Sequence, residues 1–215
     1  MRNAAGKSEL AGSWLETLRA VTDRAAHEVR GALNGVSLNL EVVRARTDRG
    51  AIDPSGVVPF AAAAAEQLAA VTARVEALLA LTREVRGPIE VRAIVMQVVT
   101  LLAPAMRSDG GSLELAPDGG DASTVTSAEP DAVRLAVAAV LLAAGRRRAA
   151  LLCRIVVRDA IILQVDGVED SSGVEADIVR AAADAGICIE QHQDAFLVAF
   201  PPPAEAGRAP EHGRS

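Results

Sequence analysis

Two long amphipathic segments, separated by a short run of helix-breaking residues, constrain this chain more than any other feature. In the first, from residue 8 to about residue 46, apolar side chains recur at steps of three and four, with heptad a positions at 22, 29, 36 and 43. In the second, at about 58–85, the apolar seam is Leu68, Val71, Val75, Leu78, Thr82 and Val85. The stretch TDRGAIDPSG between them ends helices. We therefore predict an antiparallel helical hairpin.

A single hairpin leaves much of each apolar stripe uncovered. Pairing two hairpins buries both stripes in a four-helix bundle, as in other helical bundles. The sequence therefore predicts a homodimer.

The remainder of the chain has a different sequence pattern, in which short β-rich runs alternate with helical ones. EPDAVRLAVAAVLLAAG is predicted as a helix with Pro130 near its start and Gly145 near its end. LLCRIVVRDAIILQVDG is predicted as a β-hairpin that turns at 158–159, and ICIEQHQDAFLVAF as a second one. The predicted class is α+β, a helical hairpin followed by a small α/β sandwich. The predicted divisions are a hairpin domain at 8–86, an α/β domain at 88–201 and a disordered tail at 202–215.

Composition excludes several classes of function. The net charge of −6 argues against a general nucleic-acid binder, which carries a basic surface. Cys153 and Cys188 lie far apart without neighbouring metal-ligand motifs, so we expect two buried free thiols and no metal site. No uninterrupted apolar run reaches about 18 residues, so we expect a soluble, cytoplasmic protein without a membrane span.

The first predicted helix contains a histidine close to residues that weaken helices. Within AAHEVRGALNGVSLNLEVVR, His27 precedes Gly31, Asn34 and Gly35, and each glycine costs about 1 kcal/mol relative to alanine. With position 22 at a, His27 falls at f and faces away from the seam. The small residues beside it would let another protein approach closely. A solvated histidine with incidental glycines is the alternative, and periodicity does not decide between the two.

The motif A-H-E-V-R-x-x-L-N-x-V resembles the phospho-accepting H-box of two-component sensor histidine kinases. The resemblance covers about residues 10–201, and it includes EPDAVRLAVAAVLLAAGR as the counterpart of the N-box helix. It implies that His27 is the phospho-acceptor and that Glu28 orients the ring or accepts its proton. It also implies that Arg30 helps to neutralise phosphoryl charge.

The departures from the family pattern fall on its ATP site. Ala139 and Ala143 stand where the family has asparagines that hold Mg²⁺ and phosphates. Of Asp-x-Gly-x-Gly only Asp166 and Gly167 remain, and EDSSGV replaces a lid. We therefore expect a degenerate ATPase-like domain with neither nucleotide nor metal of its own. Gly31 also replaces the family's Thr or Asn, so phosphatase activity is not expected.

The predicted function is a histidine phosphotransferase that shuttles a phosphoryl group between response-regulator receiver aspartates and His27 without ATP. The receiver would supply Mg²⁺, and a sensor kinase is a further candidate partner. The predicted docking surface comprises Arg30, Gly31, Asn34, Gly35 and Leu38. Two alternatives stay open, a divergent active histidine kinase and a non-catalytic regulator that binds receivers.

Overall fold

The computed structural model describes residues 4–48, 54–117, 122–145, 150–168 and 173–203. Residues 204–215 of the predicted tail lie outside this set, as do residues 169–172 of the segment that replaces the family's lid.

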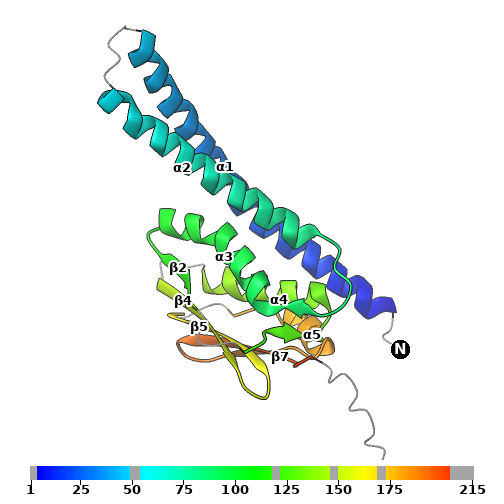
Figure 1. The fold of residues 1–215 in the computed structure, drawn as a ribbon. Coiled ribbons are helices and arrows are strands. Elements are labelled where there is room, and N and C mark those ends of the chain that lie inside the picture. The colour runs from blue at the N-terminus through cyan, green and yellow to red at the C-terminus, as the bar shows by residue number, and fades with distance from the viewer. Residues whose placement is uncertain (1–3, 49–53, 118–121, 146–149, 169–172, 204–215) are drawn as a thin grey trace, which may run out of the picture.

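The chain opens with the predicted antiparallel hairpin of two long helices (Figure 1). Helix α1 spans Ala4–Asp48 and helix α2 spans Pro54–Thr82. Near the tip, the Arg46 guanidinium donates a hydrogen bond to the carbonyl of Gly56 and stacks 4.8 Å from the centroid of the Phe60 ring. These contacts join the two helices beside their connection.

The α/β part carries the predicted helix and the two predicted β-hairpins, together with further helices and strands. Its helices are α3 (Val91–Ser108), α4 (Pro130–Ala144) and α5 (Ala176–Asp184). The main sheet contains β2 (Ser112–Leu115), β4 (Ala150–Val157), β5 (Ile161–Asp166), β6 (Cys188–Gln191) and β7 (Ala195–Phe200). A separate pair contains β1 (Ile89–Glu90) and β3 (Val125–Thr126).

The main sheet is mixed, with strand order β2-β4-β5-β7-β6. The β2–β4 pair is parallel, and the other three pairs are antiparallel. Helices α3 and α4 lie between this sheet and the hairpin, so the molecule has three layers (Figure 1). The predicted α+β class is confirmed, and the pairing of two hairpins stays a prediction.

Helix α4 lies at the centre of the core, because nearly all of its side chains are buried. The lower half of α1, residues 4–25, packs on α4, α3 and α5, and its buried residues Leu10, Trp14, Val21 and Ala25 join the core of the α/β part. Packing therefore runs without a break across the predicted boundary at Gly87, and the division into two domains stays a prediction.

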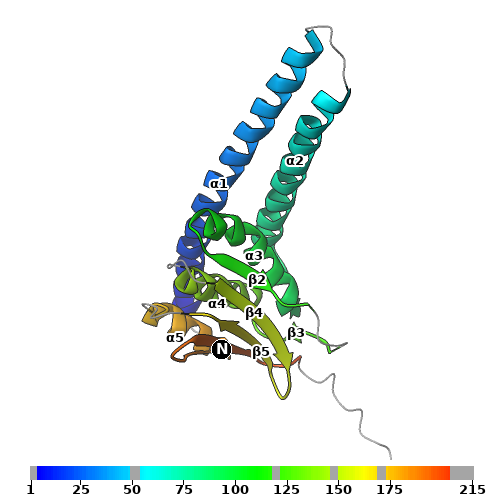
Figure 2. The same cartoon turned by 90° about the vertical axis from the view of Figure 1, so that its left-hand side faces the viewer.

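The upper half of α1, residues 26–48, has no buried residue. It contacts α2, and the distal half of the hairpin extends beyond the α/β part in both views (Figures 1 and 2).

A buried arginine ties the base of the hairpin to α4. The Arg134 side chain is only 3% exposed, and its Nη1 lies 2.9 Å from Asp131 Oδ1. Its Nη2 donates to the carbonyl oxygen of Arg83, 2.8 Å away, just past the end of α2. Carbonyls at a helix C-terminus lack partners within the helix and carry partial negative charge. Arg134 therefore satisfies the end of α2 and fixes it to α4.

Two helices are long and apolar enough, by length and composition alone, to cross a membrane. They are Ser55–Thr82, with mean hydropathy 1.3, and Val91–Ser108, with mean hydropathy 1.2. Half of the apolar window in α3 is buried in the core, against 11% of the window in α2. Burial explains the apolar character of α3, whereas most of the apolar residues of α2 are not buried.

Candidate functional site

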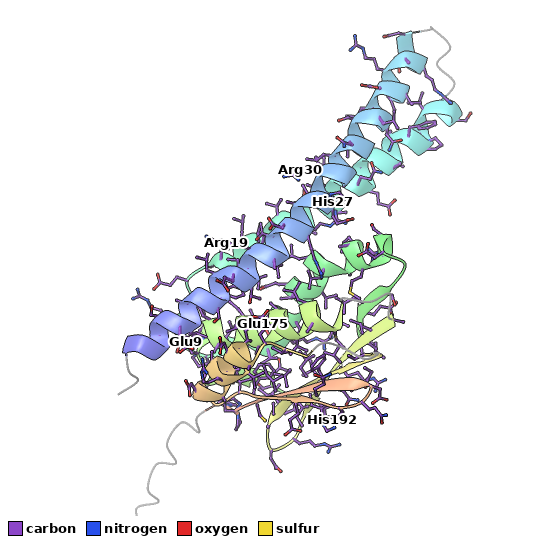
Figure 3. The ribbon with its side chains drawn as sticks, turned by 180° about the vertical axis from the view of Figure 1, so that it is seen from behind. Glu9, Arg19, His27, Arg30, Glu175 and His192 are labelled. Atoms are coloured by element: carbon purple, nitrogen blue, oxygen red, sulfur yellow. The ribbon has the colours of Figure 1, made fainter. Side chains whose placement is uncertain are left out.

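His27 lies on the outward face of α1, just above the level at which the α/β part ends (Figure 3). Its side chain is exposed. Within the part of the chain that the structure describes, no hydrogen bond or ion pair engages the imidazole. A ring nitrogen of His27 is therefore accessible to a reactant carried by another molecule.

Glu28 is directed toward the α/β part. Its Oε2 accepts a hydrogen bond from the Ser108 hydroxyl, 3.4 Å away at the C-terminal end of α3. The predicted catalytic pair is therefore adjacent in sequence, but Glu28 is held at α3 and makes no hydrogen bond to His27 among the described residues. An exposed bond of this length is weak and leaves the carboxylate free to rotate.

Most of the predicted docking surface is open. Arg30, Gly31, Asn34 and Leu38 are all exposed, and Leu38 is 63% exposed. A Cβ atom added at Gly31 would meet nothing within 4 Å. Leu38 lies on nearly the same face of α1 as His27, about three turns or roughly 16 Å further along the helix. An exposed leucine is a contact of the kind that protein interfaces use.

Gly35 is more enclosed than the other predicted docking residues, and its part in docking stays a prediction. A Cβ atom on Gly35 would lie 2.7 Å from Nε2 of Gln67 on α2. The Gln67 Oε1 also accepts a hydrogen bond from Asn39 Nδ2, 3.3 Å away. Eight residues past His27, the helix has turned by roughly 80° toward α2, since it advances about 100° per residue. Gly35 therefore lets Gln67 pack between the helices.

The face of α4 that carries Ala139 and Ala143 is covered by the lower half of α1. A hollow of about 210 Å³ remains between α1, α4 and the start of α5. It is lined by Ser13, Glu16, Thr17, Ala20, Ala139, Leu142, Ala143, Gly173, Val174, Glu175, Asp177 and Ile178. The small side chains of Ala139 and Ala143 thus allow α1 to approach the face on which the sequence resemblance expects a nucleotide.

The charge of this hollow is unfavourable for a nucleotide triphosphate. Its described lining includes Glu16, Glu175 and Asp177, and no arginine or lysine. Figure 3 shows Glu175 beside α1. Carboxylates repel phosphate oxygens, and this repulsion is stronger near protein than in bulk water.

Arg180 on α5 adds an ionic contact with the lower half of α1. Its Nη2 pairs with Glu9 of α1 and lies 2.9 Å from Asp177. The hydrogen bond that Arg180 donates to Glu9, followed by the charge of Glu9, raises the pKa of Arg180. The pair is exposed, so it contributes little stability but favours the seating of α1 on α5.

Asp166, which resembles the aspartate of the family's adenine-binding motif, has a structural role in the sheet. It ends β5, lies 3.1 Å from Arg154 Nη1 on β4, and accepts a hydrogen bond of 2.6 Å from Gln164. Gly167 follows with φ +84°, and a Cβ there would lie 2.1 Å from the carbonyl oxygen of Ala150. The glycine is required by close backbone packing.

The two cysteines occupy different environments. Cys153 is buried as predicted, and burial, reinforced by the charge of Asp166, raises its thiol pKa to about 12. The prediction that Cys188 is buried is wrong, because Cys188 is exposed on the edge strand β6. Desolvation and then the neighbouring Glu190 raise the pKa of Cys188. Raised pKa values disfavour the thiolate, so neither cysteine is suited to nucleophilic chemistry.

No group of three or more His, Cys, Asp or Glu side chains converges as a metal-ligand set within the described residues. His192 lies at the surface, 3.5 Å from Glu190 (Figure 3). It is remote from His27 and serves as a matched control for it.

Three residues that support the site were not predicted from the sequence: Ser108, Gln67 and Arg134. Arg134 could have been found, because it is the only charged residue within an apolar run from Ala132 to Ala144. A charge there must be paired if the helix is buried. Ser108 and Gln67 give no comparable signal, since their roles depend on which helix lies opposite.

Comparison with protein-family models found no match, and comparison with curated proteins found none. Among solved structures, the chain is similar to the histidine kinase AdeS of Acinetobacter baumannii, with 14% identity and a TM-score of 0.42 over 81% of this chain and 97% of that one. It is also similar to a histidine kinase from Burkholderia phymatum STM815, with 12% identity and a TM-score of 0.38 over 82% and 96%. Both are histidine kinases. At these values the likeness concerns the fold alone and carries no functional argument.

Proposed function

We propose that this protein is a histidine phosphotransferase of two-component signalling. It takes a phosphoryl group from the aspartate of one receiver domain onto His27 and gives it to another. The observation that carries the proposal is the contrast between two faces. The His27 face is open, whereas the Ala139/Ala143 face of α4 is covered by α1 and lined with carboxylates.

The transfer step needs only one accessible nitrogen on this chain. A lone pair on the His27 ring attacks the phosphorus of the receiver's aspartyl phosphate in line with the leaving oxygen. The bond from phosphorus to the aspartate oxygen breaks, the receiver recovers its carboxylate, and a phosphoramidate forms on His27. The second receiver's carboxylate reverses the step, so no phosphoryl group is gained or lost.

Positioning and charge neutralisation fall to the neighbours of His27. Glu28, released from Ser108, can orient the ring or hold its proton. The exposed guanidinium of Arg30 can pair with phosphoryl oxygens during transfer. We assign the Mg²⁺ that such transfer uses to the receiver, whose carboxylates would hold it.

A homodimer is part of the proposal. Large apolar side chains are exposed on both helices of the hairpin, at Leu33, Leu40, Val58, Leu68, Val75 and Leu79. A second copy would cover them in a four-helix bundle while leaving His27 on the outside. Such a dimer accounts for the outward apolar residues of α2 without a membrane, and we propose a cytoplasmic location.

A relay assay with purified protein tests the function. Receiver domains phosphorylated with a small acyl phosphate donor are mixed with the protein and then with an unphosphorylated second receiver. Label should appear on this protein and then on the second receiver. His27→Ala should abolish both transfers, and the control His192→Ala should leave both intact. Equal transfer by the His27→Ala protein would overturn the proposal.

The two alternative functions predict different outcomes in the same kind of assay. A divergent kinase would label His27 from Mg-ATP. A non-catalytic regulator would bind receivers and exert its full biological effect with His27→Ala.

A further inference from the structure

A second hollow, unrelated to the α4 face, lies where α2 meets α3 and β2. It has a volume of about 460 Å³. It is lined by Ala70, Ala73, Arg74, Val99, Thr100, Ala103, Pro104, Arg107, Leu113, Glu114 and Leu115. The walls are mainly apolar and come from three elements that are distant in the sequence, so the tertiary fold creates the groove.

Two arginines line this groove from opposite elements. Arg74 projects from α2 and Arg107 from the last turn of α3. Neither side chain takes part in a hydrogen bond or ion pair within the described part of the chain. The Nη1 atom of Arg74 is also buried without any partner. Nearly all buried polar groups in proteins have a partner, so a rotation of the Arg74 side chain that brings this nitrogen to an acceptor in the groove would be favourable.

We propose that this groove binds a small phosphate-bearing molecule with an apolar or aromatic body. A guanidinium presents parallel N–H donors that match phosphate oxygens. Two guanidiniums carry two positive charges, which is more than one carboxylate neutralises, so a phosphate is the better matched anion. The flanking Val99, Pro104 and Leu113 offer an apolar surface for the remainder of the ligand.

The remaining polar groups of the groove refine the expected ligand. The Thr100 hydroxyl already donates to the carbonyl of Met96, 2.8 Å away, so the donors toward an anion come from the two arginines. The exposed carboxylate of Glu114 is the only acidic group among the described residues of the lining. It opposes a highly charged ligand and can accept a hydrogen bond from a hydroxyl or amino group. A phosphate monoester is therefore favoured over a triphosphate.

The groove is separate from both faces discussed above. Arg107 is adjacent to Ser108, which contacts Glu28, so a bound ligand would hold α2, α3 and β2 together next to the phospho-acceptor. Binding does not require His27 or transfer. It is therefore testable by itself.

Calorimetric titration with inorganic phosphate and with AMP tests the proposal, with adenosine as the uncharged probe. AMP should bind saturably and more tightly than phosphate, and adenosine should not bind. Arg74→Met and Arg107→Met should each weaken AMP binding by about tenfold, the effect of losing one charge-assisted hydrogen bond. Glu114→Gln should strengthen it by removing a like charge. The matched control Arg86→Met alters an exposed arginine that pairs with Glu84 and should change nothing.

Two results would contradict the proposal. One is the absence of saturable binding of phosphate and AMP to the intact wild-type protein. The other is AMP binding that both arginine variants retain at full strength. Because Arg107 is exposed, its substitution leaves the core intact, and a change in the Arg107→Met protein cannot be ascribed to misfolding.

Discussion

The two halves of α1 have opposite environments although they belong to one uninterrupted helix. The lower half, residues 4–25, buries Leu10, Trp14, Val21 and Ala25 against the α/β part. The upper half, residues 26–48, buries no residue and presents His27 to solvent. The lower half covers the face of α4 where a nucleotide is expected by resemblance, and the upper half carries His27, the proposed phosphoryl acceptor. One helix thus accounts for both the proposed activity and the proposed lack of ATP use.

The largest expected effect concerns the apolar side chains of the distal hairpin. Glutamates at Leu68 and Leu79 would place two carboxylates in the proposed dimer interface, at a cost of several kcal/mol. We expect the dissociation constant of the dimer to rise by about three orders of magnitude. Light scattering on a size-exclusion column would show dimers for the wild type and monomers for the double variant.

Met96→Glu is the control, since Met96 is also exposed but lies on α3. A wild-type protein that is monomeric at micromolar concentration would contradict the proposed bundle.

The second effect concerns the lower half of α1. Trp14 is 8% exposed, and Trp14→Ala should lower the free energy of unfolding by about 3–5 kcal/mol because it leaves a cavity in the core. Leu38→Ala in the upper half should change it by no more than about 0.5 kcal/mol, since Leu38 is exposed. Urea denaturation measures both. Similar losses from the two substitutions would abolish the contrast between the halves.

A smaller effect should follow from removing the charge that fixes α2 to α4. Arg134→Met keeps much of the apolar stem but removes the hydrogen bond to the Arg83 carbonyl, and we expect a loss of about 2 kcal/mol. Arg154→Met breaks a more exposed ion pair with Asp166 and should cost no more than about 1 kcal/mol. If Arg134→Met is neutral by thermal unfolding, the attachment of α4 to α2 depends on apolar packing alone.

The smallest effect distinguishes the two glycines. Gly31→Ala should stabilise the protein by up to about 1 kcal/mol, because alanine favours helix and its methyl group meets nothing. Gly35→Ala should gain less, because its methyl group displaces Gln67 and disturbs the bond to Asn39. Gly31→Leu should also impair transfer from receivers, whereas the fold should survive. Equal stabilisation by the two alanines, measured by thermal unfolding, would return Gly35 to the open surface.

Much of this fold could be predicted from the sequence, because its signals are local. The hairpin follows from apolar spacing and a Gly/Pro-containing break, and the strands follow from β-rich runs between turns. Pro130 lies at the start of α4 as expected, and Gly186, with φ +78°, follows the end of α5.

What could not be predicted depends on which elements lie opposite one another. Periodicity shows that α1 has an apolar stripe, but not that its lower half packs on α4 while its upper half stays open. In the same way, Gly31 and Gly35 look equivalent in sequence, and only the position of Gln67 separates them. Ala139 and Ala143 indicated missing ligands, yet their small size also creates the seat for α1.

The most direct test compares two donors on the same preparation. The protein is incubated in parallel with Mg-ATP and with phosphorylated receiver domains, and phosphate on His27 is quantified against a His27→Ala sample. The account predicts phosphohistidine from a receiver and none from Mg-ATP. Phosphorylation of His27 by Mg-ATP would show that the covered face of α4 does admit a nucleotide and would contradict the account.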